Sequence, residues 1–152
     1  MAASVDFSTK KEFLMFAVLT EINWLAVVAS TLVFAILGGV YFTAVIPKPY
    51  ARALGNENKE PARPGPLVIV GPLVSSLVIV VTSAVLMRAL EVQSLADGIA
   101  FGLIVGVGYL VAQTFTIAIN PNFPRPVFYT LINAPYFLVC MLAASVILTL
   151  WR

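Results

Sequence analysis

The chain has 152 residues, of which 61% are hydrophobic and 11% are charged, whereas soluble proteins average roughly 45–50% and roughly 25%. A soluble domain of this size cannot hide so much apolar surface from water. The chain has no histidine and one cysteine, and its net charge of +2 comes without a basic cluster. This composition excludes His-ligated haem, His-based catalysis, an intrachain disulfide and a nucleic-acid-binding surface.

The first 21 residues predict an interfacial tail. Lys10, Lys11 and Glu12 precede the apolar residues 13–16, which is typical of a short helix lying at the membrane surface. A helix running from residue 13 to residue 46 would be about 51 Å long, which is too long for a single crossing. We therefore expect a break at residues 20–23, with Trp24 at the level of the lipid headgroups.

Four stretches of the chain contain no charged residue: 22–46, 67–87, 99–119 and 127–151. Each reaches the roughly 20 residues that cross a hydrocarbon core as a helix. We therefore predict an all-α fold, in which a bundle of four transmembrane helices follows the short interfacial amino-terminal helix. Residues 1–152 are expected to form a single membrane domain.

The loops between the predicted helices indicate the topology. The first loop, 47–66, contains five prolines and four basic residues, and its residues 50–54 are compatible with one helical turn. The third loop, 120–126, is short and proline-rich, so the third and fourth helices should be antiparallel neighbours. Four crossings put both termini on one side, which carries four Lys and Arg residues against five on the other. The positive-inside rule therefore favours a cytoplasmic location for the first and third loops.

Several segments resemble a known family. Residues 22–27 (Ile-Asn-Trp-Leu-Ala-Val) and 37–41 (Leu-Gly-Gly-Val-Tyr), followed by a basic loop, are similar to the start of the domain of unknown function 1761 family. Residues 131–134 (Leu-Ile-Asn-Ala), Tyr136 and the ending 150–152 resemble its closing helix. The sequence departs from the family in its proline-rich first loop and at Pro135. The resemblance implies a small four-helix membrane protein of a family found in bacteria and fungi, and it supplies no reaction. We expect this chain to be integral to the bacterial plasma membrane.

Glycines mark one face of the third predicted helix. Gly98, Gly102 and Gly106 recur every four residues, so they lie on the same side of the helix. Because glycine has no Cβ atom, another helix can approach this face closely. Similar surfaces are expected on the first and second helices, at Ala35 with Gly39 and at Gly71 with Ser75. We expect these positions to serve helix packing, and a ligand groove is the alternative.

Five polar side chains are expected at one depth in the bilayer: Tyr41, Ser75, Ser76, Gln113 and Asn133. Gln113 and Asn133 each lie six residues from the same membrane boundary, which is about 9 Å along a helix. Steps of four, three and four residues lead from Gly102 to Gln113, so Gln113 is predicted to face the bundle interior. An unpaired amide in hydrocarbon costs several kcal/mol, so both amides should find partners within this layer.

The polar layer has two interpretations. It could stabilise the bundle through interhelical hydrogen bonds, each contributing roughly 0.6–2 kcal/mol. Pro135 would add to this demand, because it leaves the carbonyl of Leu131 without its helical donor. Alternatively, the layer could line a small cavity for a neutral or amphiphilic ligand, since broken helices and polar groups at a shared depth recur in transport sites.

No enzyme is expected, because no predicted span carries an ionisable carboxylate or base and no catalytic, metal-ligand or phosphate-loop motif occurs. No cofactor is expected, and Cys140 is interpreted as a small inert residue. The first functional hypothesis is a non-enzymatic integral membrane protein that acts through helix–helix association, as a homo-oligomer or as a small subunit of a complex. The alternative is a small permease or a lipid- or amphiphile-binding protein that uses the polar layer. The expected partners are the lipid bilayer and a second copy or another membrane protein, and no nucleic acid.

Overall fold

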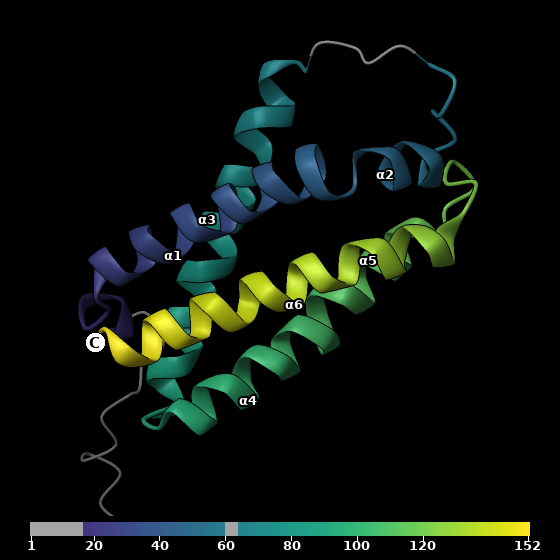
Figure 1. The fold of residues 1–152 in the computed structure, drawn as a ribbon. Helices are drawn as coiled ribbons and strands as arrows, with labels where there is room; N and C mark the ends of the chain where they lie inside the picture. Colours follow the sequence, from purple (N-terminus) through teal and green to yellow (C-terminus); the bar gives the residue numbers. More distant parts are fainter. Residues whose placement is uncertain (1–16, 60–63) are drawn as a thin grey trace, which may run out of the picture.

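The computed structural model of the protein describes residues 17–59 and 64–152, and every regular element in these two ranges is helical (Figure 1). In chain order the elements are η2 (Ala17–Thr20), α1 (Trp24–Val40), η3 (Tyr41–Val45), α2 (Pro47–Ala53), α3 (Pro66–Ala89), α4 (Leu95–Val105), η4 (Gly106–Val111), α5 (Ala112–Ala118) and α6 (Pro126–Leu150). η2 is a 3₁₀ turn, whereas η3 and η4 are π-helical. The predicted all-α fold class is confirmed.

Four helical segments are long and apolar enough to cross a membrane. They are span 1 (Trp24–Val45), span 2 (Pro66–Ala89), span 3 (Leu95–Ala118) and span 4 (Pro126–Leu150). The largest difference from the predicted boundaries is at span 3, which begins four residues before the uncharged stretch. The Ser94 hydroxyl accepts a hydrogen bond from the Asp97 amide at 3.0 Å and caps this helix. Asp97 is therefore compatible with the first turn, because the amino-terminal end of a helix favours a carboxylate.

The predicted break before span 1 is confirmed. The η2 turn ends at Thr20, residues 21–23 are not helical, and Asn23 caps α1. The Asn23 side-chain oxygen accepts hydrogen bonds from the amides of Leu25 at 3.0 Å and Ala26 at 3.2 Å. The predicted interfacial helix at residues 10–16 lies outside the described residues. The single turn expected at residues 50–54 is instead the seven-residue helix α2, which starts at Pro47 because proline is favoured in a first helical turn.

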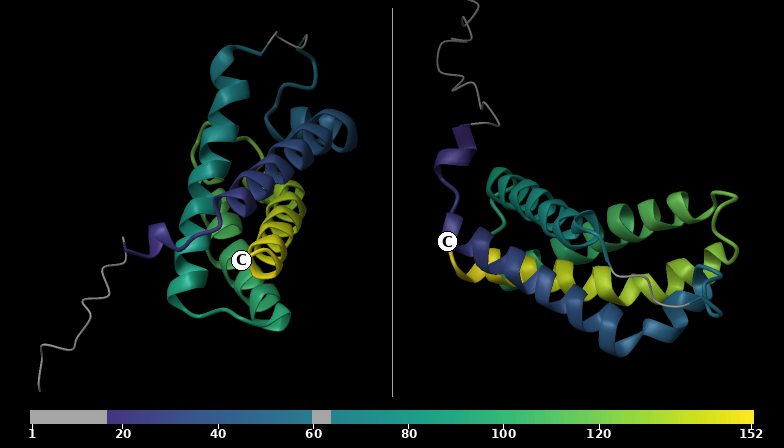
Figure 2. Two further views of the ribbon diagram at one scale, coloured as in Figure 1. Left: turned by 90° about the vertical axis from the view of Figure 1, so that its left-hand side faces the viewer. Right: turned by 90° about the horizontal axis from the view of Figure 1, so that it is seen from above.

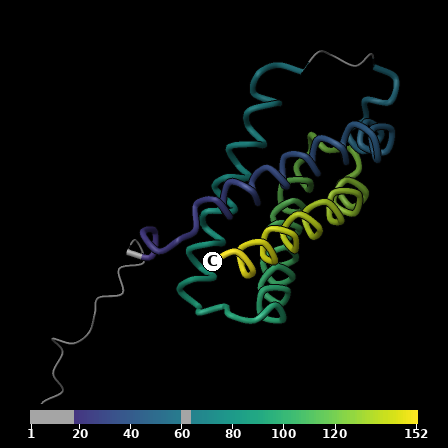
Figure 3. Tube along the Cα trace, turned by 60° about the vertical axis from the view of Figure 1, so that its left-hand side comes forward, coloured from purple at the N-terminus to yellow at the C-terminus, as the bar shows by residue number. Residues whose placement is uncertain are grey.

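Span 4 lies at the centre of the bundle. α6 packs against α1, α4, η4 and α5, and it also contacts α2. In contrast, α3 crosses the other helices obliquely and packs mainly on α1 (Figures 2 and 3). Its amino-terminal part is largely uncovered, since Leu67 is 81% exposed and Val70 is 53% exposed. Span 2 is therefore the most loosely attached of the four.

Polar contacts tie the segments together at the end where the chain terminates. The Arg88 guanidinium at the end of α3 forms a 2.8 Å ion pair with Glu21, just before α1. The Arg152 guanidinium donates hydrogen bonds to the carbonyls of Val92 and Thr149. The start of α1 and the carboxyl terminus therefore lie at one end of the bundle, as four crossings require, and α2 and the third loop lie at the other (Figure 1).

The apolar core joins all four spans. Its buried members are Val27, Phe34, Val80, Ala84, Met87, Phe101, Cys140, Met141 and Ala144. Side chains from α1, the carboxyl-terminal half of α3, α4 and α6 contribute to it. The core thus lies towards the end of the bundle that carries the termini, where α3 is packed, and the uncovered part of α3 is at the opposite end.

Candidate functional site

The glycine face of span 3 lies directly against span 4. A Cβ atom built on Gly102 would lie 2.9 Å from the Ser145 hydroxyl and 3.3 Å from the Leu142 Cα atom. One on Gly98 would lie 3.2 Å from the Thr149 Cβ atom, and one on Gly106 would lie 3.1 Å from a Leu138 methyl group. The two backbones therefore approach each other more closely than side chains would allow, which is the packing expected of small residues at four-residue spacing.

Gly39 does not share this role, and the prediction that it packs against a helix is wrong. A Cβ atom on Gly39 would meet nothing within 4 Å, whereas one on the preceding Gly38 would lie 2.9 Å from the Tyr136 hydroxyl. Adjacent residues differ by about 100° around a helix. The four-residue spacing from Ala35 to Gly39 therefore predicted the wrong face of span 1. The face that contacts α6 contains Gly38, one residue earlier in the chain.

Three members of the predicted polar layer are hydrogen-bonded inside the bundle. The Tyr41 hydroxyl donates a hydrogen bond to the Ile132 carbonyl at 2.8 Å, which joins η3 to α6. Ile132 follows Leu131, whose carbonyl was predicted to lack its helical donor because of Pro135. The Asn133 amide donates to the Tyr129 carbonyl at 2.7 Å, and the Ser76 hydroxyl donates to the Pro72 carbonyl at 2.7 Å. Asn133 and Ser76 are both buried. Only the Tyr41 hydrogen bond joins two segments, because Asn133 and Ser76 each donate to a carbonyl of their own helix.

Gln113 does not face the bundle interior, so this prediction is wrong. Its side chain is exposed and has no hydrogen-bond partner among the described residues, whereas the adjacent Thr114 is buried. The cause is the π-helical segment η4, in which each turn contains more residues than an α-turn. The wider turns rotate the following residues, so the glycine face continues through Thr114 and Ala118 instead of Tyr109 and Gln113. Ser75 is likewise exposed and without a partner in the described part of the chain.

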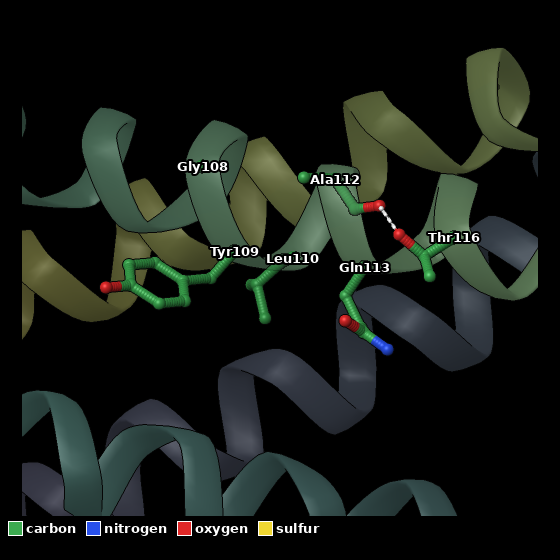
Figure 4. Close-up of a pocket in the computed structure, with 6 residues that line it drawn as sticks. All are labelled: Gly108, Tyr109, Leu110, Ala112, Gln113 and Thr116. Carbon is green, nitrogen blue, oxygen red and sulfur yellow. Dashed lines mark hydrogen bonds between the residues drawn. The ribbon is translucent and has the colours of Figure 1, made fainter.

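The rotation at η4 creates a second face on span 3, which we call the open face. Its residues are Gly108, Tyr109, Ala112, Gln113 and Thr116, all of them exposed. Together with Leu110, they line a surface pocket of about 290 Å³. Figure 4 shows the side chains of Tyr109, Leu110 and Gln113 pointing to the same side of the helix. The open face therefore combines two small residues at four-residue spacing with an amide that has no partner.

A cluster of aromatic rings at the other side of the bundle was not predicted. Its members are Phe34, Tyr41, Phe42, Tyr50, Phe123, Tyr129, Tyr136 and Phe137. Phe42 lies 5.0 Å from Tyr50 and 5.1 Å from Tyr136 between ring centroids, and Tyr50 lies 5.8 Å from Tyr129. These contacts fasten η3 and α2 to α6. The sequence signal was a concentration of aromatic residues beside the prolines of the first and third loops, but it carries no periodicity that indicates contact.

The described residues include no group of three or more Cys, Asp or Glu side chains that could hold a metal ion. The arrangement offers packing surfaces, hydrogen bonds within helices and one open polar face. Three apolar spans packed around a fourth define the class as a four-helix bundle with the dimensions of a membrane protein. The chain belongs to the DUF1761 family of proteins of unknown function, whose family model matches residues 25–149. No curated protein and no solved structure matches the chain.

Proposed function

We propose that the protein is a non-enzymatic integral membrane protein that acts through helix–helix association, and that the open face of span 3 is its contact surface. The observation that carries this proposal is Gln113, an exposed amide without a partner within an apolar span. Such an amide facing lipid loses hydrogen bonds that acyl chains cannot replace. A second helix on the open face would supply them.

The neighbours of Gln113 suit such a contact. A Cβ atom on Gly108 would meet nothing within 4 Å, so a helix from outside can come close to the backbone at this position. Ala112 follows at four-residue spacing, and the Thr116 hydroxyl donates to the Ala112 carbonyl at 3.1 Å. Small residues flanked by hydrogen-bonding side chains are the usual composition of contacts between membrane helices. The partner is a second copy of this chain or a helix of another membrane protein.

Cross-linking through Tyr109→Cys, which leaves the Gln113 amide in place on the open face, tests this proposal. We expect membranes that contain this variant to give a cross-linked adduct with a bifunctional thiol reagent, and the adduct should disappear when Gly108→Leu is added. The wild type serves as the background, because Cys140 is fully buried. Gly39→Leu is the matched control, since Gly39 also has open space around it and lies on a different helix.

The size of the adduct identifies the partner. A band of twice the monomer mass, containing two differently tagged copies, indicates a homo-oligomer. A heavier band with one tagged copy indicates a subunit of a larger complex. Absence of any adduct, or an adduct that persists in the Gly108→Leu variant, would overturn the proposal that the open face is the contact surface.

A second candidate function is the binding of a small amphiphile on the open face, and the pocket beside Gln113 favours it. If the protein binds an amphiphile, Gln113→Leu should lower the retention of a fluorescent fatty-acid probe by the purified protein. The cross-linked adducts of cysteines placed elsewhere on the open face should be unchanged. If helix association is the function, the same substitution should weaken the adducts and leave probe retention unaltered.

We further propose a location in the bacterial plasma membrane, with the first and third loops in the cytoplasm. The distribution of Lys and Arg, five on that side and four on the other, supports this orientation. Single cysteines at Asn56 and Asn122 should then react with a membrane-impermeant thiol reagent only in inverted vesicles. Labelling of the two positions from opposite sides would contradict the four-span topology itself.

A further inference from the structure

The two ends of the bundle differ in whether their basic side chains have hydrogen-bond or ion-pair partners. At the end that carries the termini, both described arginines are engaged: Arg88 pairs with Glu21, and Arg152 binds two backbone carbonyls. At the opposite end, Arg125 is engaged as well. The exposed side chains of Lys48, Arg52 and Lys59 have no hydrogen-bond or ion-pair partner in the described ranges. Among residues 17–59 and 64–152, the basic side chains without a partner are therefore concentrated at the end that holds α2.

The helix α2 presents two of these cations on one side. Lys48 and Arg52 are four residues apart, so they lie one above the other on the same face of the helix. Tyr50 and Ala53 lie roughly opposite, where Ala53 is fully buried and the Tyr50 ring contacts Phe42. The face with the charges therefore points away from the bundle.

The position of α2 is held by contacts on its other side. The Arg125 guanidinium donates a 2.7 Å hydrogen bond to the Arg52 carbonyl and forms a 3.2 Å ion pair with Glu57. The Glu57 carboxylate is the nearest one to Arg52 in the sequence, and it is already paired with Arg125. It therefore does not neutralise Lys48 or Arg52.

An uncovered apolar surface lies at the same end of the bundle as α2. α3 begins there at Pro66, and its first residues are uncovered, with Leu67 at 81% and Val68 at 65% exposed. An anionic lipid has a charged headgroup, which the free cations of α2 match, and acyl chains, which the uncovered part of α3 at the same end of the bundle matches. We propose that Lys48 and Arg52 bind the anionic headgroup of a phospholipid in the leaflet bordered by α2.

Native mass spectrometry of the purified full-length protein in detergent tests the site, with dioleoyl phosphatidylglycerol and dioleoyl phosphatidylcholine as probes. We expect preferential retention of phosphatidylglycerol. The variant with Lys48→Gln and Arg52→Gln should bind it about 30-fold more weakly, because each basic residue near a membrane surface strengthens binding about fivefold. Phosphatidylcholine binding should be unchanged.

Two control variants separate a site from a general effect of charge. Arg88→Gln with Arg152→Gln removes the same net charge at the opposite end and should retain phosphatidylglycerol as the wild type does. Lys48→Arg with Arg52→Lys keeps both charges and should also retain it, which shows that α2 tolerates substitution at these positions. Equal loss of lipid in the two Gln variants would overturn the proposal, because it would indicate a net-charge effect.

Inorganic phosphate distinguishes a lipid site from an anion site. Millimolar phosphate should not displace phosphatidylglycerol if the acyl chains contribute through α3. Full displacement by phosphate, or equal retention of phosphatidylcholine and phosphatidylglycerol by the wild type, would overturn the proposal. Because none of these measurements involves the open face of span 3, their failure leaves the proposed helix association unaffected, and the reverse also holds.

Discussion

Span 3 carries small residues on two faces, and the two faces have opposite surroundings. On one face, Gly98, Gly102 and Gly106 lie so close to α6 that a Cβ atom on any of them would be within 3.2 Å of an α6 side chain. On the open face, Gly108 has no atom within 4 Å of such a Cβ position. Both faces have the same four-residue spacing. The four-residue spacing of small residues therefore shows where a second helix can come close, and only the packing shows whether one does.

The π-helical segment is what separates the two faces. An α-helix turns about 100° per residue, so a run of four-residue steps drifts by about 40° at each step. The buried positions Gly98, Gly102, Gly106, Thr114 and Ala118 keep four-residue multiples along the whole span. The wider turns of η4 compensate for the drift. Without η4, the face would continue towards Gln113, as the sequence pattern alone predicts.

The largest expected effect comes from filling the packed face. Gly102→Leu should lower the free energy of unfolding in detergent by about 3 kcal/mol, because the Leu142 backbone cannot move away from an added side chain. Gly108→Leu on the open face should leave it within about 1 kcal/mol of the wild type. Thermal unfolding of both variants in the same detergent measures the difference. Equal melting temperatures would contradict the distinction between the faces.

A smaller effect is expected at the glycine pair of span 1. Gly38→Ala should lower the free energy of unfolding by about 1–2 kcal/mol, because the new methyl group would lie 2.9 Å from the Tyr136 hydroxyl in a ring cluster with little freedom to move. Gly39→Ala should raise it by up to about 1 kcal/mol, since alanine is the better helix former and has space. The sign of the two changes, measured by titration with denaturing detergent, is the test. The same sign at both positions would disprove the assignment of the packed face to Gly38.

The smallest expected effect concerns two tyrosines, one with a hydrogen-bonded hydroxyl and one on the open face. Tyr41→Phe removes the hydrogen bond to the Ile132 carbonyl and should lower the free energy of unfolding by about 1 kcal/mol. Tyr109→Phe should change it by less than about 0.5 kcal/mol, because Tyr109 is 70% exposed and its hydroxyl has no partner among the described residues. A loss for Tyr109 as large as that for Tyr41 would mean that the open face is already covered in the purified protein.

The fold was predictable to a large extent because hydrocarbon imposes a simple rule. Backbone groups in the bilayer must be satisfied within the segment, so uncharged stretches of this length predict helices. The same rule placed the start of span 3 four residues too late, since it ignores a helix cap that accommodates Asp97. The break before span 1 was predictable from length alone, and the cap at Asn23 supplies its structural basis.

The candidate site was predictable only in part, because it depends on helix rotation. Asn133 was expected at the interior and is buried, but its amide binds its own helix. Gln113 was expected beside it and lies on the open face. A rotation of one residue changes neither hydropathy nor span length, so nothing in the composition of the stretch could reveal it.

The sequence by itself determined the number of candidate spans, their approximate ends, the location of both termini at one end of the bundle and the glycine face of span 3. These features follow from local chemistry, namely the cost of unpaired backbone in hydrocarbon and the absence of a Cβ atom. Only the tertiary structure decided that α6 is central, that α3 is loosely attached, and that Gly38, rather than Gly39, meets a neighbour. It also decided the orientation of Gln113. The orientation of Gln113 follows from the wide π-turns of η4, and the other three features depend on contacts between segments far apart in the chain.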